Sequence, residues 1–137
     1  MPRYLLDTNI CIYIAKGKPP EVLSRFESLA EGDLAMSVVT YGELLFGAER
    51  SGSAARALAT VDQLTVAIPV LPLNPEVAAH YGSIRATLAE VGTPIGNNDL
   101  WIAAHARATR LTVVTNDETE FRRVPGLKVE NWVDTHR

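Results

Sequence analysis

Short apolar runs alternate along the chain with longer segments in which apolar residues recur every three or four positions. The short runs predict buried strands, and the longer segments predict helices with one apolar side. The predicted strands cover residues 4–6, 34–39 and 111–114, with 70–73 as a short strand or extended link and a last edge strand beginning at Val129. The predicted helices cover residues 10–16, about 20–29, about 44–52, 53–67, about 75–91 and 100–109. This alternation is typical of an α/β fold with a mainly parallel sheet flanked by helices, and it leaves the strand order open.

Polar residues that commonly cap helices stand where several of the predicted helices begin. Thr8 and Asn9 precede the first helix, and Thr40 with Glu43 has the spacing of a capping box. The pair 98–99 opens the last predicted helix. We therefore expect these helices to begin at or just after these residues.

The composition fits one folded domain over residues 1–137. Of the 137 residues, 47% are hydrophobic and 21% are charged, and the net charge of −3 weakens the case for nucleic-acid binding without excluding it. The single cysteine, Cys11, excludes an internal disulfide and a cysteine zinc cluster, and we expect it in the core. The apolar run over 10–15 is too short for a membrane span or a signal peptide, so a cytoplasmic protein with no membrane contact is expected.

Acidic residues follow the predicted strands or open the predicted helices. In chain order they are Asp7 after the first strand, Glu43 just beyond the second, Asp99 at the start of the last predicted helix, and Asp117 after the strand that follows it. Each one alone is explained more simply, by a helix cap, a capping box or a turn. Ligands of open α/β sheets bind at the carboxyl ends of the strands, where these carboxylates are expected to meet. An oxygen-only group of this kind suits Mg²⁺ or Mn²⁺ and phosphoryl chemistry.

Five motifs run along nearly the whole chain in a fixed order. They are LLDTN (residues 5–9), TYGEL (40–44), IGNNDLWIAAHA (95–106), VVTN with a following EF (113–116 and 120–121), and VPGL leading to ENW (124–127 and 130–132). In order and spacing these motifs resemble a PIN domain, and more narrowly a VapC-type toxin of a bacterial toxin–antitoxin pair.

The resemblance implies a PIN-like three-layer α/β fold and Mg²⁺-dependent endoribonuclease activity on structured RNA, often tRNA, with Mn²⁺ as a substitute metal. It also implies a homodimer that a VapB-type antitoxin neutralises. The implied catalytic residues are Asp7, Glu43, Asp99 and Asp117, of which Asp7 and Asp99 bind the metal directly. The implied supporting residues are Thr8, Thr115, Asn116 and Glu120, and Glu120 stays open as the alternative to Asp117 for the fourth acidic position.

Other classes of protein also gather carboxylates at strand ends. A phosphorylated receiver domain needs a lysine after a late strand, but lysines occur only at positions 16, 18 and 128. A phosphatase that forms an aspartyl-phosphate needs a second aspartate two residues after Asp7, where Asn9 stands. The remaining alternative is a PIN-like module that binds a partner and cuts nothing. His105, six residues after Asp99, is expected in the core or on the helix surface rather than in the site.

Overall fold

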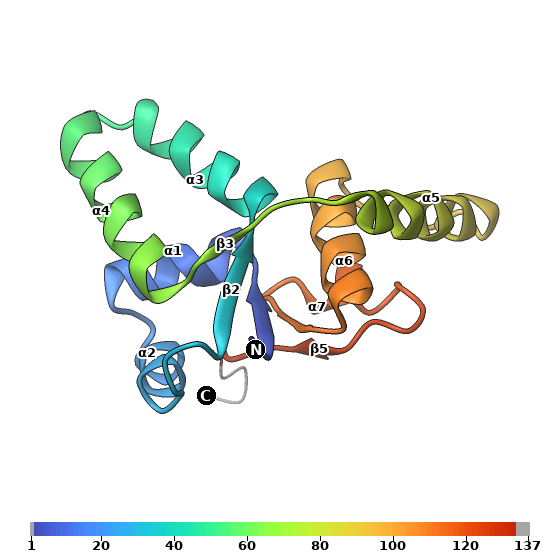
Figure 1. Cartoon of the computed structure of the whole chain (residues 1–137), viewed down its shortest axis with the longest axis horizontal. Coiled ribbons are helices and arrows are strands. Elements are labelled where there is room, and N and C mark those ends of the chain that lie inside the picture. Colours follow the sequence, from blue (N-terminus) through green and yellow to red (C-terminus); the bar gives the residue numbers. More distant parts are fainter. Residues whose placement is uncertain (1, 134–137) are drawn as a thin grey trace.

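Five short parallel strands form the centre of the fold. The computed structural model describes residues 2–133, and within them the strands are β1 (Tyr4–Leu6), β2 (Leu34–Ser37), β3 (Val70–Leu71), β4 (Thr112–Val114) and β5 (Val129–Glu130). They pair in the order β3-β2-β1-β4-β5, and each pairing is parallel (Figure 1). Tyr4 lies opposite Leu34 on one side and opposite Thr112 on the other. The predicted α/β class with a mainly parallel sheet is confirmed.

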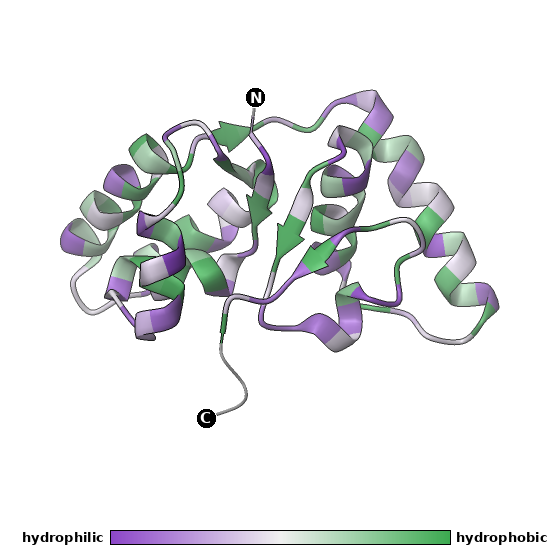
Figure 2. Ribbon diagram, turned by 90° about the horizontal axis from the view of Figure 1, so that it is seen from below, coloured by the Kyte–Doolittle hydropathy of each residue, from purple (hydrophilic) through white to green (hydrophobic). Residues whose placement is uncertain are grey.

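Helices cover both faces of the sheet and complete the three layers. They are α1 (Thr8–Lys16), α2 (Pro20–Glu27), α3 (Val38–Glu49), α4 (Ala54–Ala67), α5 (Pro75–Glu90), α6 (Asn97–Thr109) and α7 (Glu118–Phe121). Helices α1 to α4 lie on one side of the sheet, and α5 to α7 lie on the other (Figures 1 and 2). The three-layer arrangement that the resemblance implied is therefore confirmed.

The strands are buried on both faces, because successive side chains of a strand point to opposite sides of a sheet. Leu6 and Met36 pack into the core with α1 to α4, whereas Leu5 and Val113 pack into the core with α5 to α7. All four side chains are fully buried, and so is Cys11 in the first core, as predicted. Burial on both faces explains why the strands appear in the sequence as continuous apolar runs.

Helix α3 begins earlier than predicted because a different side chain caps it. Strand β2 stops at Ser37, and the Ser37 hydroxyl accepts a hydrogen bond from the Val39 N–H at 3.1 Å. The predicted strand over 34–39 is therefore two residues too long. The predicted capping box is also wrong, because Thr40 lies inside the helix and is fully buried there.

The starts of α1 and α6 also differ from the prediction. Asp7 caps α1, so the helix begins at Thr8, and neither Thr8 nor Asn9 is the cap. Helix α6 begins at Asn97 after Gly96, so Asp99 lies within its first turn. The short helix α7 was not predicted, because four residues are too few to show a helical period.

The length of the helices bears on membrane contact. The longest helix, α5, has 16 residues, whereas a bilayer span needs about 20 apolar ones. Between residues 2 and 133, no helix is both long enough and apolar enough to cross a membrane. Met1 and residues 134–137, which complete the predicted domain of 1–137, lie outside the described residues.

Candidate active site

The predicted site residues meet at the carboxyl edge of the sheet. Asp7 directly follows β1, Thr115 directly follows β4, and these two strands are neighbours. Parallel strands end at the same edge, so the two side chains come together. Glu43 reaches this edge from α3, where it contacts Thr8 of α1, and Asp99 comes from the first turn of α6. Elements that are far apart in the sequence thus build one site.

Asp7 is buried, with only 5% of its surface exposed. One carboxylate oxygen accepts a hydrogen bond from the Ile10 N–H at 3.0 Å, and the other accepts one from the Thr115 hydroxyl. Burial raises the pKa of Asp7 to about 6 against the effect of these two hydrogen bonds, and the charges of Asp117 and Glu43 add to the rise. An ionised Asp7 is therefore costly unless a cation lies beside it.

Two side chains hold the carboxylate of Glu43. The Thr8 hydroxyl donates to Oε1, and the Asn98 amide donates to Oε2 at 3.2 Å. Thr8 belongs to α1 and Asn98 to α6, so Glu43 links three helices. With both oxygens engaged, the carboxylate is oriented before any ligand binds.

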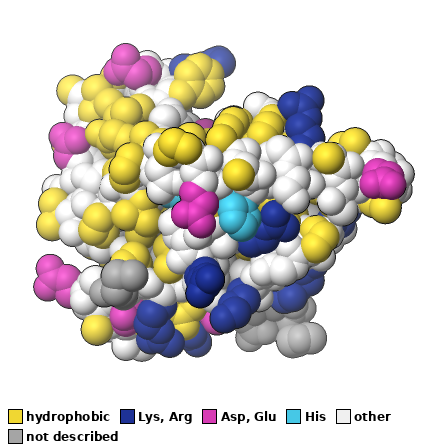
Figure 3. All heavy atoms as spheres, turned by 45° about the vertical axis from the view of Figure 1, so that its right-hand side comes forward, with side chains coloured by type: hydrophobic (Ala, Val, Ile, Leu, Met, Phe, Trp, Pro, Cys, Tyr) yellow, Lys and Arg dark blue, Asp and Glu magenta, His cyan; other side chains and the backbone are white. Residues whose placement is uncertain are grey.

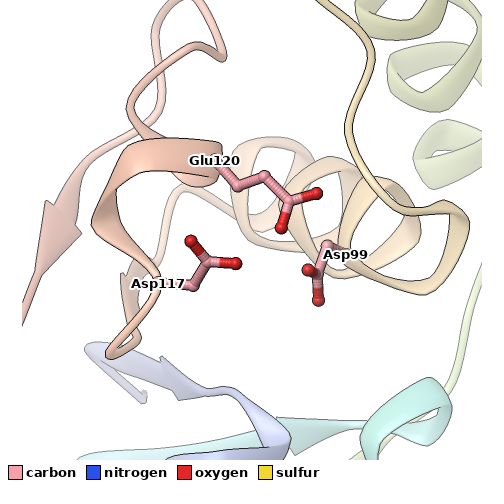
Figure 4. A group of neighbouring side chains, drawn as sticks. All are labelled: Asp99, Asp117 and Glu120. Atoms are coloured by element: carbon pink, nitrogen blue, oxygen red, sulfur yellow. The ribbon is translucent and has the colours of Figure 1, made fainter.

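Asp99, Asp117 and Glu120 form a compact acidic group (Figure 4). One carboxylate oxygen of each lies within 4.8 Å of the other two. Burial, followed by the hydrogen bond and the charge of Glu120, raises the pKa of Asp99 to about 7. The hydrogen bond between Asp117 and Glu120 raises the pKa of Asp117 and lowers that of Glu120. Glu120 also accepts a hydrogen bond from the Gly96 N–H, which ties α7 to the start of α6.

The donor set of this acidic group fits a hard divalent cation. Its candidate ligand atoms are carboxylate oxygens, which Mg²⁺ and Mn²⁺ prefer, and no histidine or cysteine joins the group within residues 2–133. The raised pKa values of Asp7 and Asp99 reflect burial and mutual repulsion, both of which a bound cation offsets. The acidic group can therefore hold a divalent metal ion.

The structure brings most of the predicted residues to this site, with Asn116 as the exception. The Asn116 amide donates to the Tyr13 hydroxyl at 3.2 Å, and Asn131 contacts its oxygen, so in the described part of the chain it bonds no site carboxylate. Asp117 and Glu120 were alternatives for one acidic position, and both lie beside Asp99.

Asn98 is a site residue that the sequence analysis did not single out. Its hydrogen bond to Glu43 was not visible in the motif, because it depends on how α6 packs against α3. The available signal was its place directly before Asp99 in the stretch IGNNDL.

Comparison with known proteins shows the family to which the chain belongs. A family model described as the PIN domain matches residues 4–127. The chain belongs to the PIN-domain family. Ribonuclease VapC2 of Haemophilus influenzae is 45% identical to it over 133 residues, which cover 97% of this chain and 100% of that relative. The tRNA(fMet)-specific endonuclease VapC of Shigella flexneri is 46% identical over 132 residues, covering 96% and 99%.

The solved structures extend the likeness from sequence to fold. A chain of DNA-bound VapBC from Salmonella typhimurium superimposes on this PIN-domain chain with a TM-score of 0.91 and 42% sequence identity. The match covers 97% of this chain and 100% of that chain. The resemblance to VapC-type PIN domains that the motifs indicated is confirmed.

Proposed function

We propose that this PIN-domain protein is a Mg²⁺-dependent endoribonuclease toxin of the VapC type that cleaves cytoplasmic RNA. The observation that carries the proposal is the group of Asp99, Asp117 and Glu120 oxygens within 4.8 Å of one another, with the buried carboxylate of Asp7 close enough for its charge to raise the pKa of Asp99. The relatives are named as a ribonuclease and an endonuclease, which supports cleavage of RNA as the reaction. One of them is named for tRNA(fMet), so initiator tRNA is the first candidate substrate.

The acidic group of Asp99, Asp117 and Glu120, together with Asp7, would hold the metal. Bound Mg²⁺ neutralises charge on an RNA phosphate and lowers the pKa of a water molecule. Asp7 and Asp99 are proposed as direct ligands, with Asp117 and Glu120 near enough to Asp99 to complete the set. The Thr115 hydroxyl holds one oxygen of Asp7, so this side chain needs little reorganisation to bind. Hydrolysis is expected to leave a 3′-hydroxyl and a 5′-phosphate.

Glu43 is proposed to orient the water shell of the metal or to hold a second metal. Its hydrogen bonds to Thr8 and Asn98 support this role, because they fix the carboxylate from two sides. Residues that hold a metal ligand or its waters in place commonly affect metal affinity about 10- to 100-fold.

Cleavage of purified tRNA tests the proposal. Initiator tRNA and an elongator tRNA are incubated separately with the protein in Mg²⁺, Mn²⁺ or EDTA, and the new RNA ends are sequenced. We expect cleavage of initiator tRNA with either metal and none in EDTA. A protein that binds RNA or a partner but leaves every RNA intact with both metals supports the alternative, a non-catalytic PIN-like module.

A VapB-type antitoxin is proposed to occupy the groove between α1, α3 and α4. The groove has a volume of about 500 Å³, and its apolar lining includes Ala15, Leu44, Ala48 and Val61. Glu43 also lines this groove, so a segment bound there reaches the acidic residues. An arginine of that segment can pair with two carboxylate oxygens and displace the cation.

A single glycine on α3 gives a test of this groove. Gly47 lines it, and a Cβ atom added there meets nothing within 4 Å, so the uncharged side chain of Gly47→Leu has room to begin and extends into the groove. We expect this variant to cleave RNA but to escape the antitoxin. Gly82→Leu on α5, where a Cβ is equally unobstructed, is the matched control and should stay neutralised. If both variants are neutralised alike, the antitoxin binds elsewhere.

A homodimer is proposed through the outer side of α3. Val38, Gly42 and Phe46 recur at a spacing of four on this helix, and Phe46 is 63% exposed. With Val39 they line one side of a second groove of about 640 Å³, whose other lining residues are Thr8, Glu43 and Asn98, so this interface borders the acidic site. Figure 3 shows hydrophobic side chains over the upper and left-hand parts of one face. A second copy that covers this surface removes it from water. Phe46→Glu should convert a dimer to a monomer in sedimentation velocity, and a dimer that persists would place the interface elsewhere.

A further inference from the structure

A buried hydrogen bond joins α6, which carries Asp99, to the residue that caps α3, the helix that carries Glu43. His105 of α6 is 1% exposed, and its Nδ1 lies 2.8 Å from the hydroxyl oxygen of Ser37, which is fully buried at the end of β2. His105 lies between Ala104 and Ala106, both of which are fully buried. A polar contact in such surroundings is costly to break, because neither group can turn to water instead.

One assignment of donor and acceptor fits the other contact of Ser37. The Ser37 oxygen already accepts from the Val39 N–H, and the hydroxyl has one proton to donate. We assign this proton to a hydrogen bond with Nδ1 of His105, which requires a neutral imidazole. Burial lowers the pKa of His105, which favours the same neutral form.

A second hydrogen bond joins the same two helices at the acidic site. Ser37 caps α3, and six residues later Glu43 accepts from Asn98 of α6. Seven residues after Asn98, His105 contacts Ser37. The two contacts are thus about 9 Å apart along α3 and about 10.5 Å apart along α6, at the helical rise of 1.5 Å per residue. The two spacings are similar, so both hydrogen bonds can form at once. The chain directions of α3 and α6 are opposite between these two contacts.

We propose that the Ser37–His105 hydrogen bond sets the position of α6 against α3 and thereby the separation of Asp99 from Glu43. Ser37 is the last residue of β2, so the bond also fixes α6 to the sheet edge at which Asp7 lies. Ser37 and His105 are positioning residues, because they act through the carboxylates and not on the RNA. This inference rests on the proposed nuclease function, and it predicts that metal binding and turnover depend on a contact in the core.

Substitutions of His105 separate positioning from simple stabilisation. His105→Leu keeps a side chain of similar size and removes the acceptor, whereas His105→Asn places an amide oxygen near the position of Nδ1. We expect His105→Leu to lower kcat about 10- to 100-fold with little change in KM, and to weaken Mn²⁺ binding to the metal-free protein about 10-fold. His105→Asn should recover most of the kcat and most of the Mn²⁺ affinity. His105→Gln, whose amide lies nearer the position of Nε2, should recover less.

A matched control identifies what destabilisation alone does. Ile84→Ala on α5 opens a cavity in the same core without touching either contact between α3 and α6. It should lower the melting temperature and leave kcat and Mn²⁺ affinity unchanged for the folded fraction. If His105→Leu behaves like Ile84→Ala, or if Asn and Gln at position 105 are equivalent, the positioning role is wrong.

Failure of this inference is distinguishable from failure of the proposed function. A wild-type protein that cleaves no RNA overturns the nuclease proposal, and the Mn²⁺ titration, followed by calorimetry, still decides the positioning role. If His105→Leu does not fold, Ser37→Ala and Ser37→Thr replace it. Ser37→Thr, which keeps the hydroxyl, should then bind Mn²⁺ more tightly than Ser37→Ala, and equal affinities would overturn the inference.

Discussion

At the scale of single residues, the buried carboxylates make the metal-free protein sensitive to pH. The pKa of Asp7 is raised to about 6 and that of Asp99 to about 7, from the ordinary aspartate value of 3.8. An acid with a raised pKa in the folded state stabilises the fold while it is protonated. This stabilisation is complete below the unfolded pKa and is lost as the pH rises through the folded pKa. In EDTA, the melting temperature should therefore fall as the pH rises from about 5 to about 8.

Asparagine at position 99 tests this explanation without a large change in shape. Asp99→Asn should raise the melting temperature at the upper end of this pH range and flatten the dependence. Asp62→Asn, at an exposed position on α4, should follow the wild-type curve. Identical pH dependence in all three proteins would show that repulsion at the site does not control stability.

At the scale of elements, the residue that ends α6 has a backbone conformation that lowers the stability of the fold. Arg110 follows the helix in the left-handed region with φ 59°, and its N–H donates to the carbonyl of Ala106 or Arg107. A side chain with a Cβ is disfavoured there by about 1 kcal/mol, whereas glycine is not. Arg110→Gly should raise the melting temperature by a few degrees in thermal unfolding, and Arg110→Ala should not. Equal melting temperatures for the two variants would contradict this account.

The existence of most elements could be predicted from the sequence, and several of their ends could not. Periodicity identifies a segment as helix or strand, but the point at which β2 becomes α3 depends on how far β2 pairs with its neighbours. Ser37 and Thr40 both have capping side chains, and the pairing of Ser37 with Leu71 of β3 carries the strand up to Ser37. Strand order was unpredictable for the same reason, because it is decided by packing between distant elements.

The acidic residues were predictable, but their grouping was not. Asp7 and Asp117 could be placed at one edge, because parallel strands end together. The approach of Glu120 to Asp99 depends on α7 and on the hydrogen bond from the Gly96 N–H. Neither feature leaves a periodic pattern of apolar residues from which it could be predicted. The contact between Asn98 and Glu43 likewise requires α3 and α6 to be placed first.

At the scale of the whole molecule, metal binding and folding should be coupled. A cation that binds only the folded state stabilises it by about 1.4 kcal/mol for each tenfold rise in concentration above its dissociation constant. The melting temperature should therefore rise with millimolar Mg²⁺ or Mn²⁺, return to its starting value in EDTA, and respond much less in Asp7→Asn. Differential scanning calorimetry at fixed pH and ionic strength measures this, with Ca²⁺ as a test of selectivity. A melting temperature that does not change with metal would exclude a shared site.

Single-turnover cleavage of initiator tRNA by the wild type, Asp99→Asn and Asp62→Asn tests the central claim most directly. Asp99→Asn removes one charge from the acidic group and keeps the shape of the side chain, whereas Asp62→Asn makes the same change away from the site. With Mg²⁺, we expect the wild type and Asp62→Asn to cleave at equal rates. Asp99→Asn should bind the tRNA but cleave it at least about 100-fold more slowly. A folded Asp99→Asn protein that cleaves at the wild-type rate would contradict the account.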